Sequence, residues 1–119
     1  MVGSAAAQSP PPPVATASQS FGFDYKDSDL SASAVTRFEM AIDAGTYVSV
    51  NIPPIANDAL TPTGSSTYKV PIPALVTGQH TVKFRACNAS LCSADGPVLT
   101  FVLAVQPPAP SLPRIIGTR

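Results

Sequence analysis

The sequence predicts an all-β domain, and three observations lead to this prediction. Apolar and polar residues alternate along several short segments, as they do in strands with one buried face and one exposed face. Turn-forming residues separate these segments at intervals of about ten residues, which is typical of sandwiches and barrels. The intervening prolines would break any long helix, because proline lacks the amide donor that a helix interior needs.

The first expected strand lies near the start of the domain. Phe21, Phe23 and Tyr25 alternate there with Gly22 and Asp24. This alternation would place the aromatic side chains together on one face, and aromatic residues are favoured in strands. We therefore expect that face to contribute to the core.

A hairpin is expected next. Its first strand covers residues 35–42, and its partner covers residues 46–50. The residues between them, Asp43, Ala44 and Gly45, supply the turn. The buried face of the first strand would carry Phe38, Met40 and Ile42.

The last strands are expected between Tyr68 and Phe101. The pair Thr77-Gly78 is a turn signal that separates two segments of alternating apolar residues. In the second segment, one face would carry His80, Val82, Phe84 and Ala86, and the other Thr81, Lys83 and Arg85. We expect Phe84 to be a buried core residue.

The chain of 119 residues divides into a folded body and two ends of low complexity. Residues 1–19 form an expected N-terminal arm, whose four consecutive prolines at 10–13 favour an extended conformation. Residues 20–105 form the expected β-domain, and residues 106–119 form a proline-rich C-terminal arm. Each arm is either a semi-rigid spacer or a segment that lies along a neighbouring subunit.

The C-terminal arm carries the candidate docking residues. Ile115 and Ile116 stand beside Arg114 on a tether that prolines stiffen. Apolar side chains in such a position are most simply explained if they pack against a partner. We therefore predict that these three residues dock to another protein.

The charge of the chain excludes two classes of partner. Its seven basic and seven acidic residues cancel, and only 12% of the residues are charged. Such a surface does not attract nucleic acid or an anionic membrane electrostatically. Moreover, no apolar run approaches the roughly 20 residues of a membrane helix. Protein partners are expected, either other subunits of an assembly or further copies of this chain, with a glycan or host-surface ligand as a further possibility.

The stretch from Tyr68 to Phe101 resembles the E, F and G strands of a fibronectin type III or related immunoglobulin-like sandwich of the bacterial and phage kind. Outside this stretch, Phe21, Phe23 and Tyr25 are similar to the B strand and residues 37–50 to the C and C′ hairpin. Within it, residues 75–80 are similar to the E–F corner and residues 85–93 to the F–G hairpin with its paired cysteines. Tyr25 stands where such domains commonly carry tryptophan, and His80 where they carry tyrosine. The resemblance implies an antiparallel β-sandwich used for recognition or spacing, with neither catalysis nor a cofactor.

The two cysteines leave two alternatives open. Cys87 and Cys92 flank a four-residue loop and could be bridged by a disulfide across a hairpin. By alternation Cys87 lies on the outer face of its strand, so the bridge would be a surface clip. In a reducing cytosol the two residues would instead be free thiols. A zinc site is not expected, because two cysteines and one histidine do not supply four ligands.

Other polar residues are expected to be structural. His80 has no nucleophile beside it in the sequence, so we expect a corner histidine that hydrogen-bonds the backbone. Asp24, Asp27 and Asp29 do not follow the spacing of a calcium loop, and we expect a solvated strand end there. No constellation of acid, base or metal ligands is visible, so an enzyme is not expected.

Two functions remain. The first is a structural subunit of a virus particle such as a bacteriophage, for example a capsid-decorating protein, which docks through its arms and strand edges. If Met1 is the natural start, the chain has no signal peptide and would assemble in the host cytoplasm. The alternative is an adhesion or carbohydrate-binding module of a longer secreted, extracellular protein, with Tyr47 and Tyr68 as the candidate exposed aromatic residues.

Overall fold

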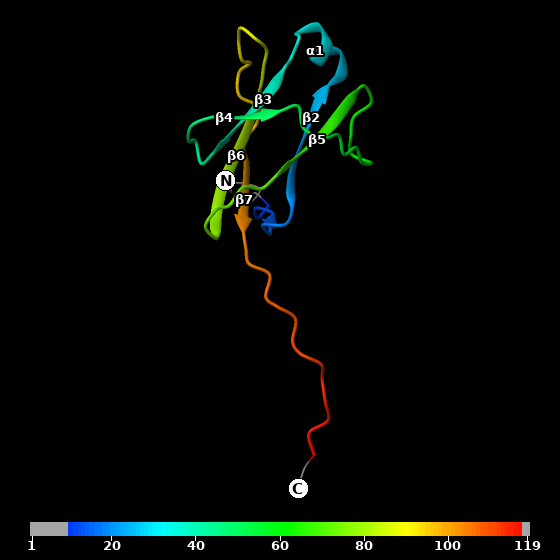
Figure 1. Ribbon diagram of the computed structural model, residues 1–119, viewed down its shortest axis with the longest axis vertical. Helices are drawn as coiled ribbons and strands as arrows, with labels where there is room; N and C mark the ends of the chain where they lie inside the picture. Colours follow the sequence, from blue (N-terminus) through cyan, green and yellow to red (C-terminus); the bar gives the residue numbers. More distant parts are fainter. Residues whose placement is uncertain (1–9, 118–119) are drawn as a thin grey trace, which may run out of the picture.

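The computed structural model describes residues 10–117, which form two facing β-sheets and one short helix (Figure 1). The elements are β1 (Val14–Ala15), β2 (Ser20–Lys26), α1 (Asp27–Ala32), β3 (Arg37–Ile42), β4 (Val48–Asn51), β5 (Ser65–Pro71), β6 (Gly78–Cys87) and β7 (Leu99–Leu103). One sheet has the order β1-β7-β6-β3-β4, and the other pairs β2 with β5. Among the strand pairs of the described residues, the β1–β7 pair alone is parallel. The predicted all-β class is confirmed.

The core lies between the sheets. Side chains of β2 and β5 meet those of β3, β6 and β7 in one cluster of buried residues, Phe21, Met40, Val70, Ile72, Val82, Phe101 and Leu103. A smaller cluster holds Phe38, Tyr68 and Ala86. The predicted alternation along β2 is confirmed, because Phe21 is buried and Phe23 packs against both clusters.

The predicted turn between β3 and β4 is also confirmed. Asp43 and Ala44 have positive φ angles of 53° and 56°, and the Gly45 amide donates to the Ile42 carbonyl at 2.8 Å. Two successive residues with positive φ match the twist of a tight hairpin. Asp43 suits this position because aspartate tolerates left-handed backbone better than most residues.

One helix was not expected from the sequence. Asp27 and Asp29, predicted to lie in a solvated strand end, instead occupy the first turn of α1. Acidic residues are favoured there because the helix N-terminus carries a partial positive charge. The Asp27 carboxylate also accepts a hydrogen bond from the Ser66 hydroxyl at 2.6 Å, which ties the helix to β5.

The N-terminal segment contributes a strand that the predicted arm did not include. β1 pairs with β7, and the Val102 amide donates to the Pro13 carbonyl at 2.9 Å. The part of the predicted arm before Pro10 lies outside the described residues. At the other end, the chain leaves β7 and runs away from the body without helix or strand as far as Gly117 (Figure 1). Thr118 and Arg119 lie outside the described residues.

Phe84 differs from the prediction. It is only half-buried, although its ring packs against Phe23 with a centroid separation of 4.5 Å. The reason is that the space beside Phe84 opens to solvent, next to Gly96 and Pro97.

No helix within residues 10–117 is long and apolar enough to cross a membrane.

Candidate functional site

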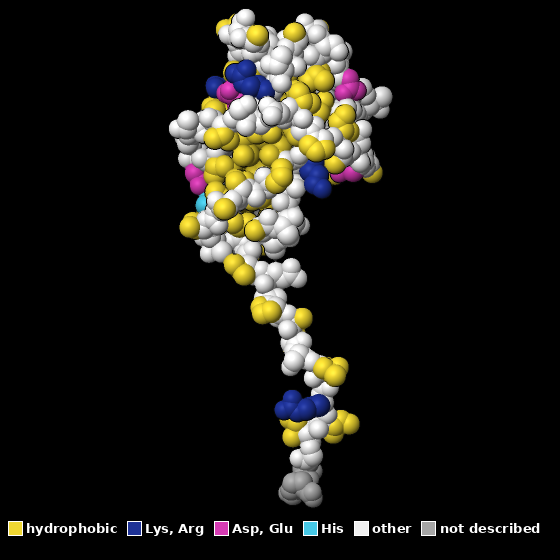
Figure 2. All heavy atoms as spheres, in the orientation of Figure 1, with side chains coloured by type: hydrophobic (Ala, Val, Ile, Leu, Met, Phe, Trp, Pro, Cys, Tyr) yellow, Lys and Arg dark blue, Asp and Glu magenta, His cyan; other side chains and the backbone are white. Residues whose placement is uncertain are grey.

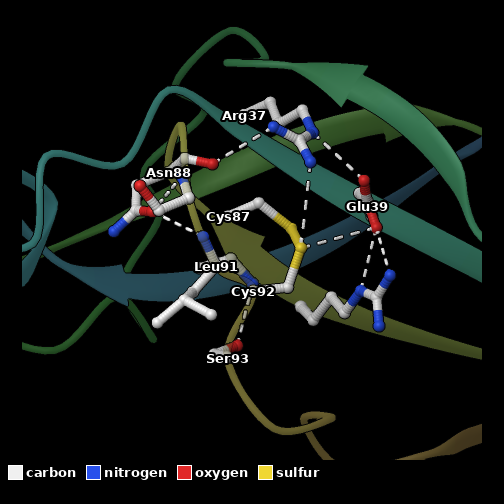
Figure 3. A network of polar contacts seen from close by, with 10 residues as sticks. Arg37, Glu39, Cys87, Asn88, Leu91, Cys92 and Ser93 are labelled. Atoms are coloured by element: carbon white, nitrogen blue, oxygen red, sulfur yellow. Dashed lines mark hydrogen bonds and ion pairs between the residues drawn. A yellow bond between two sulfur atoms is a disulfide. The ribbon is translucent and has the colours of Figure 1, made fainter.

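A disulfide between Cys87 and Cys92 joins the end of β6 to the loop that leads to β7 (Figure 3). Cys87 and Cys92 face each other as an antiparallel pair, and their sulfurs are bonded at 2.03 Å. Between them, the Asn88 amide donates to the Leu91 carbonyl at 2.9 Å, and the Asn88 side-chain oxygen accepts from the Ser90 and Leu91 amides, both at 2.8 Å. The loop is therefore held by its own hydrogen bonds as well as by the bridge.

The expectation of a surface clip is wrong for Cys87. This residue lies on the outer face of β6, as predicted, yet it is only 1% exposed. Side chains from β3 cover the bridge, because an Arg37 guanidinium nitrogen lies 3.9 Å from the Cys92 sulfur and a Glu39 oxygen 3.7 Å from it (Figure 3).

Glu39 is clamped between two arginines. Arg37 Nε donates to one carboxylate oxygen at 3.0 Å, and Arg85 donates to the other from Nε at 2.9 Å and from its terminal nitrogen at 2.6 Å. The hydrogen bond from Arg85, followed by that from Arg37, holds the pKa of Glu39 below its ordinary value. Burial opposes this shift without outweighing it.

Glu39, Cys87 and Cys92 are residue types that bind metals, but in this structure their atoms are not available as metal ligands. Ligand atoms of Glu39, Cys87 and Cys92 lie within 4.8 Å of one another. However, the two sulfurs are bonded to each other, and the carboxylate oxygens already accept from arginines. A disulfide sulfur is not the thiolate that binds metal, so the bridged cluster is a structural network.

Tyr47 is part of a second polar cluster on the outer face of the five-stranded sheet. The Arg85 guanidinium stacks 3.8 Å from the centre of its ring, and its hydroxyl donates to Asp95. Lys83 also donates to Asp95, at 2.8 Å. The hydrogen bond from Lys83 lowers the pKa of Asp95, while burial and the bond to Asp95 raise that of Tyr47. The ring of Tyr47 is thus occupied by protein cations, and Tyr68 is only 1% exposed.

His80 is a structural residue of the β5–β6 corner. Its Nδ1 lies 2.7 Å from an Asp43 carboxylate oxygen and its Nε2 lies 2.7 Å from the Val76 carbonyl oxygen. The prediction of a backbone hydrogen bond from His80 is confirmed. Both partners only accept hydrogen bonds, so both contacts are hydrogen bonds when His80 is protonated and each ring nitrogen donates, as in imidazolium. The bond to Asp43, followed by that to Val76, raises the pKa of His80.

Within residues 10–117, one edge of β2 has no partner strand. The Ile72 amide donates to Gln19, and the Asp27 amide donates to Gly64, at the two ends of the β2–β5 ladder. Because hydrogen bonding alternates along an antiparallel pair, Phe21, Phe23 and Tyr25 bond to β5. The groups of Ser20, Gly22 and Asp24 face the other way, and no strand within residues 10–117 pairs with this edge.

Hydrophobic side chains lie beside this edge. An open hollow of about 170 Å³ is lined by Phe23, Phe38, Phe84, Gly96 and Pro97, among others. A second hollow, of about 230 Å³, lies near the start of β2 and includes Phe21 and Leu99. Figure 2 shows hydrophobic atoms at the surface in the middle of the body. We call the edge of β2 and these two hollows the β2 groove.

The C-terminal candidates project away from the body. Leu112, Ile115 and Ile116 are 88%, 97% and 77% exposed. Arg114 stands between these apolar residues and is exposed as well. The structure therefore presents the predicted docking residues, Arg114, Ile115 and Ile116, to solvent but brings them to no site formed by the rest of residues 10–117.

Comparisons with known proteins identify no relative. No protein-family model matches the chain, and neither a curated protein nor a solved structure is significantly similar to it.

Proposed function

We propose that this protein is a non-enzymatic structural subunit of a larger protein assembly, built on an immunoglobulin-like, fibronectin type III-like sandwich. The strand order supports the fold proposal. In that scheme the B and E strands share one sheet and the C, F and G strands share the other. If β2 is B, β3 is C, β5 is E, β6 is F and β7 is G, the two sheets divide in this way.

The observation that carries the functional proposal is that one chain has both an open strand edge and an exposed apolar arm. The β2 groove offers unpaired backbone groups next to hydrophobic side chains, which is a template for an added strand. The arm offers Leu112, Ile115 and Ile116 at a distance from its own body. Both features favour a role in binding other proteins over a role in catalysis.

The polar clusters of the body support a non-enzymatic role. His80 uses both ring nitrogens for structural hydrogen bonds, so neither is left to act as a general base. Glu39 is likewise held by Arg37 and Arg85. The alternative, a glycan-binding module, loses support because Tyr68 is buried and Tyr47 is covered by Arg85.

The assembly that we propose is a bacteriophage particle, on the resemblance of the chain to phage members of the fold family. Native material from the source should be sedimented and the fractions blotted for this chain. Recovery in a megadalton fraction, and its loss from that fraction in the variant Ile115→Asp/Ile116→Asp, is the expected result. Recovery solely as a small species would overturn the proposal.

A further inference from the structure

We propose that the C-terminal arm of a second copy of this chain adds to the free edge of β2 as an antiparallel strand, with Arg114 opposite Asp24. This inference rests on the proposed function of a subunit that docks through its arms and strand edges. It names the partner as the chain itself and fixes the register of the contact.

The edge of β2 is chosen because the strand is neither short, nor interrupted by proline, nor covered by another segment of residues 10–117. Natural sheets protect their edges with short strands, prolines or covering segments. β1 has two residues and follows four prolines, and β4 has four residues and is followed by Pro53 and Pro54. The outer edge of β5 is covered, since the Ala56 amide donates to Thr67 and the Lys69 amide donates to Pro54. β2 has seven residues and no proline.

The register follows from the position of Pro113. A proline in an added strand must point its nitrogen away from the neighbouring strand, because it has no amide hydrogen to donate. Leu112, Arg114 and Ile116 would then bond to β2 through their backbones, opposite the residues whose groups face outward. Placing Arg114 opposite Asp24 puts Ile116 opposite Gly22.

The side chains agree with this register. Residues directly opposite each other in an antiparallel pair share a face of the sheet. Arg114 and Asp24 would therefore lie together on the outer face, where both are exposed and opposite in charge. Ile116 would cover the empty surface above Gly22. Ile115 would lie opposite Phe23 and point inward, into the hydrophobic hollow that Phe23 lines.

The arm is long enough for this contact and is directed away from its own body. In this register residues 112–117 lie opposite six of the seven residues of β2, and residues 104–111 remain as a linker of about 25 Å at the rise of polyproline II. Gln106, Pro107 and Ala109 each precede a proline, which keeps a residue extended and disfavours a tight reversal. The arm therefore reaches a neighbouring molecule more readily than its own β2.

A charge exchange tests the contact in the full-length chain. Sedimentation velocity should be measured for the wild type, for Asp24→Lys, for Arg114→Glu, and for an equimolar mixture of the two variants. The wild type should associate as its concentration rises, and each variant alone should associate at least about tenfold more weakly, because like charges would face each other. The mixture should regain association, since every arm then meets an edge of opposite charge.

Two further variants serve as matched controls. Asp29→Lys makes the same charge change on α1, and Gln106→Glu adds an acid to the linker of the arm. Both should associate like the wild type, and far-ultraviolet circular dichroism should show that all variants are folded.

Three results would overturn the proposal: a wild type that stays monomeric, single variants that associate like the wild type, or a mixture no better than its components. A folded-back arm gives the first of these, because no intermolecular contact forms. None of these results decides whether the native protein sediments with a large particle. The two experiments therefore test the arm contact and the proposed function separately.

Discussion

The Nδ1 atom of His80 lies 2.7 Å from the carboxylate of Asp43, so the corner before β6 is tied to the turn between β3 and β4. Asp43 also accepts a hydrogen bond from the Thr81 amide at 2.9 Å through its other oxygen. His80 itself is only 7% exposed. A single ion pair therefore links the start of β6 to the turn between β3 and β4, and its strength depends on the protonation of both partners.

We predict that thermal stability falls as the pH rises above about 6.5, the ordinary pKa of histidine. The pKa of His80 is raised above 6.5, chiefly by Asp43, so its contribution is complete below 6.5 and is lost as the pH rises through the raised value. The pKa of Asp43 is lowered below 3.8, chiefly by His80, so its contribution is present above 3.8 and is lost in stronger acid. Melting temperatures measured at increasing pH show the effect.

The variant Asp43→Asn isolates the ion pair. Asparagine tolerates the positive φ of 53° at this position, so the turn should persist. The variant should melt lower at about pH 6 and depend less on pH above that value, since His80 loses the main cause of its raised pKa. Asp58→Asn, in a loop without histidine, should keep the wild-type dependence. An unchanged pH profile in Asp43→Asn would contradict the assignment.

A second prediction compares two phenylalanines. Phe101 is 1% exposed and contacts Phe21 with a centroid separation of 5.2 Å, so Phe101→Ala should destabilise the domain by about 3–5 kcal/mol. Phe84 is half-buried at the open hollow, and Phe84→Ala should lose about half as much. Urea unfolding of both variants measures the difference. Equal losses would mean that the hollow beside Phe84 is closed in solution.

These two phenylalanines also show what the sequence could and could not predict. Alternation places Phe84 and Phe101 on inward faces, because side-chain direction is a local property of a strand. How deeply each is buried depends on what lies across from it. Both rings pack against β2, but Phe84 also lies beside a hollow of about 170 Å³ whose lining comes from distant segments.

In the candidate site, too, local features were predictable from the sequence and features that depend on the tertiary structure were not. The outward direction of Cys87 was predictable, but its burial under Arg37 and Glu39 depends on the β3–β6 register. The helix α1 was missed because six residues are too few to show helical periodicity. The free edge of β2 could not be predicted either, since a strand sequence does not reveal on which sides the strand is paired.

A third prediction concerns the disulfide. Replacing both cysteines, as Cys87→Ala/Cys92→Ala, should lower the free energy of unfolding by about 2 kcal/mol, the chain-entropy estimate for so short a loop. Loss of the buried Cys87 sulfur adds to this effect. Urea unfolding with and without a phosphine reductant separates the two contributions, because only the wild type responds to the reductant. The prediction would be contradicted if a thiol reagent showed that the reductant had broken the disulfide, yet the free energy of unfolding of the wild type stayed the same.

A last prediction tests the entry into β6. Gly78 has a φ of +124°, a conformation that L-residues with a side chain rarely adopt, although an added Cβ would lie in open space. Gly78→Ala should therefore destabilise the domain by about 1–3 kcal/mol through backbone strain alone. Gly22→Ala is the matched control, because its added methyl would meet Thr67 at an ordinary contact distance of 3.5 Å. Chemical unfolding should show the loss in the first variant and little change in the second. Equal stabilities would mean that the corner before β6 relaxes to a conformation that alanine accepts.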